Sequence, residues 1–165
     1  MTPNEQAVRS IKALMYVYAE CVDLARFDEL GELFSHGVLT STSAADPDDG
    51  MSGDDVAAFY RATNKVHADG TLRTRHVASN VIVEVADDGQ TAIARSYFAV
   101  HQATEALALQ PIVAGRYHDD FALVDGQWRF ACRLVIVEQI GDMREHLTFD
   151  LSLGDVRYAD HVEPG

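Results

Sequence analysis

The feature that most constrains the fold of this chain is a change of hydrophobic period near residue 73. From there on, apolar and polar residues alternate with a period of two, which is the spacing of half-buried β-strands. The expected strands are 73–86, 90–104, 108–124 and 127–138. The Asp88-Gly89 and Asp125-Gly126 pairs between them suit tight hairpin turns, because glycine accepts the positive φ that such turns require. Hairpin-linked strands predict an antiparallel sheet.

The residues before this change have the helical period instead. Apolar residues recur at steps of three and four between Asn4 and Leu24, which predicts an amphipathic helix. A second, short helix is expected from Phe27 to Phe34, followed by a short strand over 38–42. The stretch 44–50 is dense in turn formers and aspartates, so we expect a loop.

A third helix is expected to begin at Ser52. The Ser52–Asp55 spacing matches the S-x-x-[DE] helix start, in which both side chains satisfy free amides of the first turn. Three helices followed by a long twisted antiparallel sheet predict an α+β roll, with the first helix across its concave face.

The length of 165 residues fits a single domain over 1–165. We expect the segment 138–165 to be a C-terminal lid or tail with weak helical character around 143–147. Its apolar residues would close a pocket mouth as far as Leu153, and 160–165 would remain loose.

The charge of the chain argues against two classes of partner. Acidic residues number 26 against 13 basic ones, and the formal net charge is −13. Such a field repels nucleic-acid backbones and anionic lipid surfaces. Cys21 and Cys132 lie in apolar stretches without C-x-x-C spacing, and no signal or spanning segment is evident, which together favour a soluble cytoplasmic protein.

Two residues far apart in the sequence are candidates for acid/base chemistry. His76 stands near the start of a strand, on the face expected to carry Thr74, Ala78 and Asn80. The alternative to a catalytic role is that His76 is a core residue that hydrogen-bonds a backbone group. Asp23 falls at the end of the first helix, where the helix dipole disfavours a carboxylate. Either it is a solvated helix-end residue, or it accepts a hydrogen bond from His76.

Several segments together carry a resemblance that spans almost the whole chain. They are Tyr18 and Asp23, Thr74-Arg75-His76-Val77-Ala78-Ser79-Asn80, Gly115-Arg116-Tyr117-His118-Asp119-Asp120-Phe121, and Asp125-Gly126-Gln127-Trp128-Arg129-Phe130. These segments resemble the SnoaL-like branch of the nuclear transport factor 2-like superfamily, in particular the group of scytalone dehydratase, bile acid 7α-dehydratase and the lindane dehydrochlorinase. The resemblance implies a cone-shaped α+β fold, a pocket with an Asp/His pair at Asp23 and His76, and a homotrimer.

The resemblance also implies further site residues. Tyr18 would donate to a substrate oxygen, or is a core aromatic residue on the apolar stripe of its helix. His101, Arg133 and Asn80 are the candidates for binding polar substrate atoms, with a solvated surface position as the alternative for Arg133. Val22 departs from the scytalone dehydratase pattern, which has a tyrosine there, so a scytalone-type substrate is not expected.

The resulting hypothesis is a cofactor-independent acid/base lyase. It would eliminate water from a mostly apolar small molecule such as a steroid, terpenoid or polyketide. Isomerisation or cyclisation by the same residues is one alternative, and a non-catalytic binding module or small subunit of an aromatic-ring dioxygenase is another. No metal is expected, because the remaining histidines have no ligand spacing. An outward face with Val77, Val81, Val83 and Val85 would favour self-association.

Overall fold

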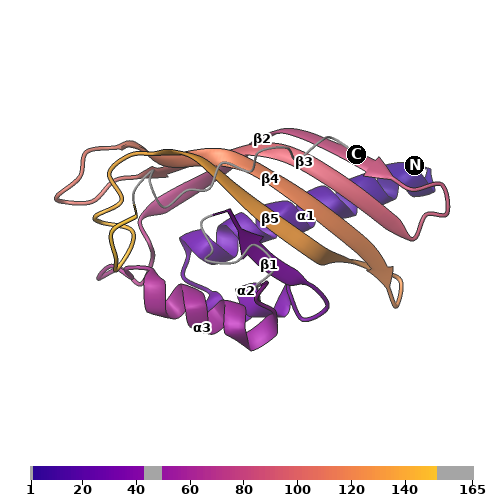
Figure 1. The fold of residues 1–165 in the computed structure, drawn as a ribbon, viewed down its shortest axis with the longest axis horizontal. Coiled ribbons are helices and arrows are strands. Elements are labelled where there is room, and N and C mark those ends of the chain that lie inside the picture. Colours follow the sequence, from indigo (N-terminus) through magenta and orange to yellow (C-terminus); the bar gives the residue numbers. More distant parts are fainter. Residues whose placement is uncertain (1, 43–49, 152–165) are drawn as a thin grey trace.

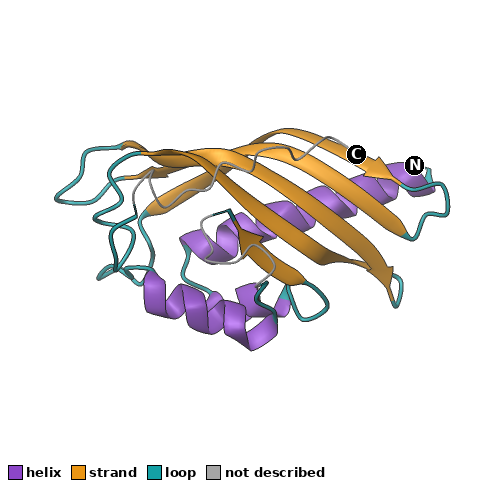
Figure 2. Ribbon diagram, viewed as in Figure 1, coloured by secondary structure: helices purple, strands orange, loops and turns teal. Residues whose placement is uncertain are grey.

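The structure is a computed structural model that describes residues 2–42 and 50–151. The described elements are α1 (Pro3–Asp23), α2 (Phe27–Glu32), β1 (Val38–Ser41), α3 (Gly53–Thr63), β2 (Thr74–Val85), β3 (Thr91–Gln102), β4 (Gln110–Val124) and β5 (Gln127–Ile140). The sheet arches over α1, and α2 and α3 lie on the same side of it (Figures 1 and 2). The α+β class and the three N-terminal helices are therefore confirmed.

The sheet has the order β1-β5-β4-β3-β2. The four long strands pair antiparallel, as predicted, but β1 pairs parallel to β5. The prediction for the long strands is therefore confirmed, and the short edge strand β1 adds a parallel pair that it did not include. No hairpin joins β1 to β5, because α3 and three strands separate them in the sequence. Their relative direction is therefore not fixed by a turn.

The two predicted hairpin turns differ in the structure. Asp125 and Gly126 have φ values of 49° and 76°, so they form the two-residue turn with positive φ at both positions that the sequence suggested. Gly89 also has a positive φ, of 66°, but its turn is longer, because residues 86–90 lie between the ends of β2 and β3.

Helix α1 begins at a capping box that sequence analysis did not identify. The Thr2 hydroxyl accepts from the Glu5 amide at 3.2 Å, and the Glu5 carboxylate accepts from the Thr2 amide at 2.7 Å. The box predicted at Ser52 does not form, since the Ser52 side chain makes no capping hydrogen bond. In a regular capping box the residue after the N-cap has a helical conformation, but Gly53, which follows Ser52, has a φ of 49°.

A bulge in β2 overturns the predicted faces of that strand. Asn80 has a φ of 53°, and the pairing with β3 shifts between Ser79 and Ile82. The extra residue reverses the alternation, so that Ile82 is exposed while three valines pack against the core. Those three are Val81, Val83 and Val85. The exposed apolar residues on β2 and β3 are instead Val77, Ile82, Ile93 and Tyr97.

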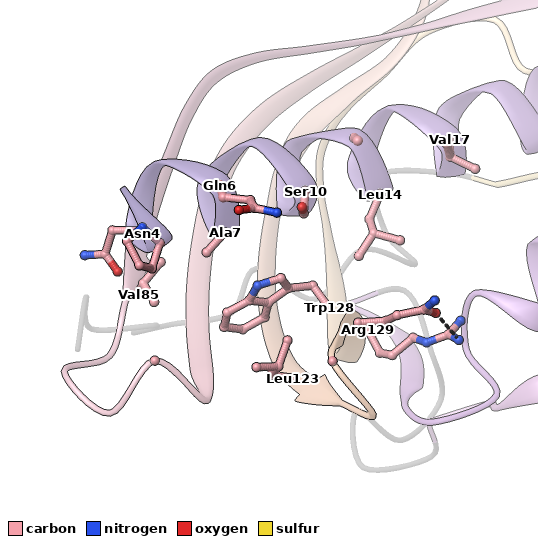
Figure 3. A pocket seen from close by; sticks show the side chains of 15 residues that line it. Asn4, Gln6, Ala7, Ser10, Leu14, Val17, Val85, Leu123, Trp128 and Arg129 are labelled. Carbon is pink, nitrogen blue, oxygen red and sulfur yellow. Dashed lines mark hydrogen bonds between the residues drawn. The ribbon is translucent and has the colours of Figure 1, made fainter. Parts of the chain in front are cut away.

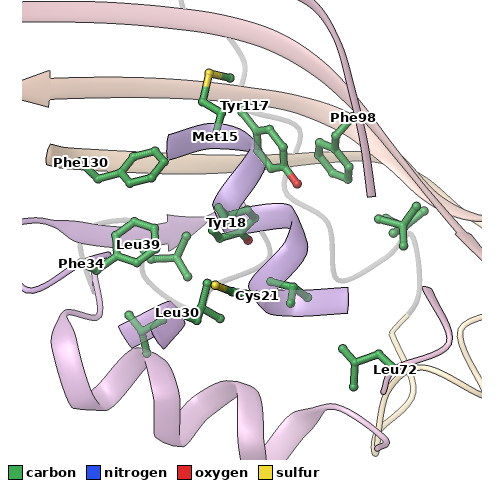
Figure 4. Packing of buried hydrophobic residues seen from close by; sticks show 14 of the residues in the cluster. Met15, Tyr18, Cys21, Leu30, Phe34, Leu39, Leu72, Phe98, Tyr117 and Phe130 are labelled. Atoms are coloured by element: carbon green, nitrogen blue, oxygen red, sulfur yellow. The ribbon is translucent and has the colours of Figure 1, made fainter. Parts of the chain in front are cut away.

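The core lies between α1 and the sheet. Met15, Tyr18 and Cys21 occupy its middle, among aromatic rings and leucines from the other elements (Figure 4). Phe98 stacks on Tyr117 with ring centres 4.5 Å apart. Burying large apolar side chains contributes about 1.5–3 kcal/mol each, so this cluster holds α1 firmly against the sheet.

The end of the described chain has no helix. Strand β5 continues to Ile140, and residues 143–147 form a turn followed by a bridge between Leu147 and Asn64, so the predicted helical character was wrong. The predicted loop over 44–49 and the tail over 160–165 lie outside the described residues. Within the described part, every helix is too short or too polar to cross a bilayer.

Candidate active site

The position of Asp23 is set by the way α1 ends. The Arg26 amide donates to the Cys21 carbonyl at 2.8 Å, and the Ala25 amide donates to the Val22 carbonyl at 3.0 Å. These two bonds form a Schellman motif, with Ala25 in the left-handed conformation at φ 54°. Asp23 is therefore held on the last turn of the helix rather than on a frayed end.

Three hydrogen bonds converge on the Asp23 carboxylate. The Thr74 hydroxyl donates at 2.6 Å, the His76 amide at 3.0 Å, and His76 Nδ1 lies 2.6 Å from Oδ1. Asp23 is only 7% exposed. Burial raises the pKa of the Asp23 carboxyl, but the bonds and charge of His76 and the Thr74 hydroxyl outweigh it, so the pKa lies below its usual value. The donors from β2 explain why a carboxylate is tolerated at a helix C-terminus.

The contact with Asp23 also fixes the form of the His76 ring. An ionised carboxylate only accepts hydrogen bonds, so Nδ1 carries the proton, and in the neutral ring Nε2 keeps its lone pair. Within residues 2–42 and 50–151, no group hydrogen-bonds Nε2. The catalytic role of this Asp23–His76 pair stays a prediction, but its geometry is that of an oriented general base.

The His76 ring lines a cavity of about 460 Å³, which we call the His76 cavity. This volume is in the range of small-molecule sites. Most of its wall is apolar. The apolar lining residues are Val22, Leu39, Met51, Phe59, Phe98, Val100, Val113, Val135, Val137, Met143, Leu147, Phe149 and Leu151. The last four show that the segment after β5 forms a wall of the cavity; its opening and closing as a lid stays a prediction.

A pair of tyrosine hydroxyls forms a polar spot in this wall. The Tyr18 and Tyr60 hydroxyls lie 2.7 Å apart, and both residues line the cavity. Burial raises the pKa of both phenols. The pair therefore stays protonated and offers a hydroxyl that can hydrogen-bond a substrate oxygen. Tyr18 was predicted; Tyr60 was missed, although its place in the apolar run of α3 was visible.

His146 is the second cavity residue that sequence analysis missed. It lines the cavity and is 6% exposed. Burial, and then the nearby His76, lowers the pKa of His146 to about 3, so its ring is neutral. A histidine among the apolar residues of the tail was the available signal.

The structure places Arg133 in the core instead of at the cavity wall. Arg133 is 0% exposed and forms a bidentate ion pair with Asp119, at 2.8 and 2.7 Å. Its guanidinium lies 4.2 Å from the Tyr18 ring centre and 4.1 Å from that of Tyr117. The predicted substrate contact is corrected to a structural one, and the solvated alternative was also wrong.

The other two predicted binding residues lie away from the cavity. Val100 pairs with His76 and lines the cavity, so the next residue, His101, points to the opposite face of β3. Asn80 is exposed at the β2 bulge. Neither residue lines the His76 cavity, because strand alternation excludes His101 and the bulge turns Asn80 outward.

A second hollow, which we call the Trp128 groove, lies at the other end of α1. Its volume is about 600 Å³, and its lining residues include Leu14, Leu123, Trp128 and Arg129 (Figure 3). Arg129 is its one charged lining residue among those described, and it donates to Gln127 at 2.8 Å. The groove therefore lacks an acid/base pair.

A metal centre has no obvious place in the described chain. Within residues 2–42 and 50–151, no three histidine, cysteine or acidic side chains gather as a metal site would require. The expectation of metal-free chemistry stays a prediction.

Comparison with known proteins identifies the family and the fold. A family model described as a SnoaL-like domain matches residues 6–133. No curated protein matches the sequence. A solved candidate scytalone dehydratase from Novosphingobium aromaticivorans is 23% identical, with a TM-score of 0.65 over 85% of this chain and 89% of that one.

Two further solved structures from the same species have the same fold. One is a nuclear transport factor 2-like protein with a cystatin-like fold, 22% identical, with a TM-score of 0.61 over 76% of this chain and 78% of that one. The other is the β subunit of a candidate aromatic-ring-hydroxylating dioxygenase, 19% identical, with a TM-score of 0.62 over 84% and 93%. At these identities the likeness concerns the fold.

Proposed function

The chain belongs to the SnoaL-like domain family, and we propose that it is an acid/base enzyme that eliminates water from a mostly apolar small molecule without a cofactor. The observation that carries this proposal is the 2.6 Å contact between His76 Nδ1 and Asp23, with the His76 ring in the wall of an apolar cavity. An oriented imidazole with a free nitrogen is a general base, and an apolar wall favours a substrate with few charges.

In the proposed reaction, His76 removes a proton from a substrate carbon. The C–H bond breaks, Nε2 gains the proton, and the electron pair forms a carbon–carbon double bond as the neighbouring C–O bond breaks. Asp23 stabilises the imidazolium that results. The imidazolium then returns its proton to the departing hydroxide, which leaves as water. The balance requires no oxidant or reductant.

The Tyr18–Tyr60 hydroxyl pair has a separate role in this proposal. Because burial raises the pKa of each phenol, both tyrosines stay protonated, and the proposal assigns the returned proton to His76. A protonated hydroxyl nevertheless stabilises developing charge on a substrate oxygen by hydrogen bonding. Isomerisation or cyclisation would use the same residues, with no bond to a leaving group broken.

The second candidate is a non-catalytic binding module. The likeness to a dioxygenase β subunit, over 93% of that chain, favours it. A subunit with only a structural role in a complex does not need a buried carboxylate that three hydrogen-bond donors hold against a histidine ring. We therefore rank it below the enzyme.

A mass-resolved substrate screen tests the proposal. The purified chain is incubated with steroid, terpenoid and polyketide alcohols, and products are analysed by mass spectrometry. Loss of the mass of water identifies elimination, whereas an unchanged mass with a new retention time identifies isomerisation. His76→Asn is the matched control, since its amide replaces the donor to Asp23 but supplies no base. Equal conversion by this variant would refute the proposal.

A further inference from the structure

Asn64 is a polar residue of the His76 cavity that the proposed reaction does not use. It is the C-cap residue of α3, is 7% exposed, and lines the cavity one helical turn after Tyr60. A buried asparagine normally hydrogen-bonds through both its amide nitrogen and its carbonyl oxygen, because an unpaired polar atom loses its hydration without compensation. The partners of each end therefore show what this side chain can bind.

The amide nitrogen of Asn64 is fully engaged by the protein. Nδ2 donates to the Tyr60 carbonyl at 3.1 Å and to the Thr63 hydroxyl at 3.2 Å. An amide nitrogen has two N–H groups, so neither is left for a ligand. The Tyr60 carbonyl can only accept, and this requirement fixes which end of the Asn64 side chain is the nitrogen.

The backbone of Asn64 is held in place as well. Its amide donates to the Tyr60 carbonyl at 3.0 Å, and Asn64 forms a β-bridge with Leu147. Beside this bridge, the Lys65 amide donates to the His146 carbonyl at 2.8 Å. The side chain is therefore fixed before a ligand arrives, as a preorganised binding group must be.

The carbonyl oxygen of Asn64 is the end that the protein leaves unpaired. Within residues 2–42 and 50–151 Oδ1 accepts no hydrogen bond, and it is not among the unpaired side-chain atoms that are sealed from solvent. A molecule in the cavity can therefore reach Oδ1. This atom only accepts hydrogen bonds, so its partner must bring a donor. A charged ammonium group is costly to bury against an apolar wall, which leaves a neutral donor such as a hydroxyl group.

We propose that Asn64 Oδ1 accepts a hydrogen bond from a hydroxyl group of the substrate that is not the one eliminated. Asn64 is then a specificity-determining residue, which selects apolar molecules with a second, unreactive hydroxyl group. The leaving hydroxyl is excluded because its oxygen gains negative charge as the C–O bond breaks, and an acceptor oxygen beside it would oppose that change. This inference rests on the proposed function, because it names a feature of the substrate of the same cavity.

The test compares the binding of 2-naphthol with that of 2-methylnaphthalene, in which a methyl group replaces the hydroxyl group. Both dissociation constants are measured by titration, and their ratio cancels any loss of affinity that the two ligands share. We expect Asn64→Leu to shift this ratio about tenfold against 2-naphthol. Asn64→Ser, whose smaller hydroxyl group can accept, should recover part of the shift. Asn4→Leu is the matched control, because it makes the same exchange at an exposed position of the Trp128 groove and should leave the ratio unchanged.

Three outcomes of the titrations would overturn the inference. Equal weakening of both ligands in Asn64→Leu would show a structural role only. A shift in Asn4→Leu would place 2-naphthol in the groove, and a shift in Tyr60→Phe with none in Asn64→Leu would assign the hydroxyl contact to the phenol pair. If Asn64→Leu does not fold, carbon NMR of the native protein decides: the Asn64 side-chain carbonyl resonance should move downfield with 2-naphthol, and an unmoved resonance would overturn the inference.

The binding measurements do not require turnover, so they separate this inference from the proposed function. A shifted ratio in Asn64→Leu without conversion of any alcohol would keep the hydroxyl contact and refute only the lyase. Where an alcohol is converted, Asn64→Leu should raise KM about tenfold and leave kcat within about twofold, because the bound hydroxyl does not react. A loss confined to kcat would place the leaving group at Asn64 and overturn the inference.

Discussion

The two halves of α1 border two hollows of similar size and different chemistry. The N-terminal half lines the Trp128 groove, of about 600 Å³, and the C-terminal half lines the His76 cavity, of about 460 Å³. Size therefore does not distinguish them, yet among the described residues Arg129 is the one charged side chain that lines the groove. The cavity is lined by His76, whose Nδ1 lies 2.6 Å from Asp23, by the neutral ring of His146 and by three tyrosines. Volume alone does not distinguish a candidate site; the gathering of titratable side chains on an apolar wall does.

The largest expected difference between the two hollows is in turnover. Asp23→Asn keeps the size of the side chain but presents an amide to His76 Nδ1, which favours the wrong tautomer. We expect turnover to fall by about 10³–10⁴-fold. Arg129→Gln in the groove should leave it within about twofold. Nitrogen NMR of the His76 ring would show whether the proton moves from Nδ1 to Nε2. Similar losses of turnover in Asp23→Asn and Arg129→Gln would show that the two hollows do not differ in their effect on catalysis.

The next largest effect concerns stability, at the core behind the cavity. Arg133→Met leaves the buried Asp119 carboxylate unpaired, so we expect a loss of about 3–5 kcal/mol in the free energy of unfolding, measured in urea. The double variant Arg133→Met/Asp119→Leu should recover most of this loss. If the double variant is stable but no longer binds ligand, Arg133 contributes to the cavity after all.

A smaller difference between the two hollows is expected in how the stability of the fold depends on pH. The pKa of His146 is lowered to about 3, so the folded ring stays neutral while the unfolded ring gains a proton below its ordinary value of about 6.5. The stabilising contribution of the neutral ring is thus present above pH 6.5 and is lost as the pH falls. His146→Gln should remove roughly 2 kcal/mol of the stability lost between pH 7 and 5.

The control for this pH effect is the same pair of measurements on Arg129→Gln. Its stability should fall with pH as steeply as that of the native protein. His118, whose pKa burial also lowers, contributes equally to all three proteins. Parallel curves for the native protein and His146→Gln would show that the folded His146 ring binds a proton.

The smallest expected effect is that of a conservative change in the groove. Trp128 is half-buried, and Trp128→Phe should cost about 1 kcal/mol of stability and change turnover by less than about twofold. Tyr60→Phe is the matched change in the cavity: it removes one hydroxyl of the Tyr18 pair and should lower turnover about tenfold. A larger catalytic loss from Trp128→Phe would mean that the groove takes part in the reaction.

Sequence patterns were informative where a local rule acts. The period of three and four placed α1, the period of two placed the four long strands, and Asp125-Gly126 placed their last turn. The unusual position of Asp23 at a helix end pointed to a partner, and the family resemblance identified His76. Their 2.6 Å contact follows from the packing of α1 on β2.

The errors lie where one local event has distant consequences. The bulge at Asn80 reverses the faces of half a strand, which moved Val81, Val83 and Val85 inward and undid the expected outward face. His101 follows an inward residue and therefore points away. Self-association stays a prediction, with Val77, Ile82, Ile93 and Tyr97 as the exposed apolar residues that remain.

The sequence by itself determined the elements of this protein and their approximate bounds, and it indicated that Asp23 needs a partner, because periodicity, turn chemistry and an ill-placed charge are local. Only the tertiary structure decided which side chains share an environment. It buried Arg133 with Asp119, set β1 parallel to β5, and brought His146 from beyond the last strand to the cavity of His76. The physical reason is that a side chain's partners, charge state and solvent access depend on contacts between residues far apart in the chain, which no local pattern records.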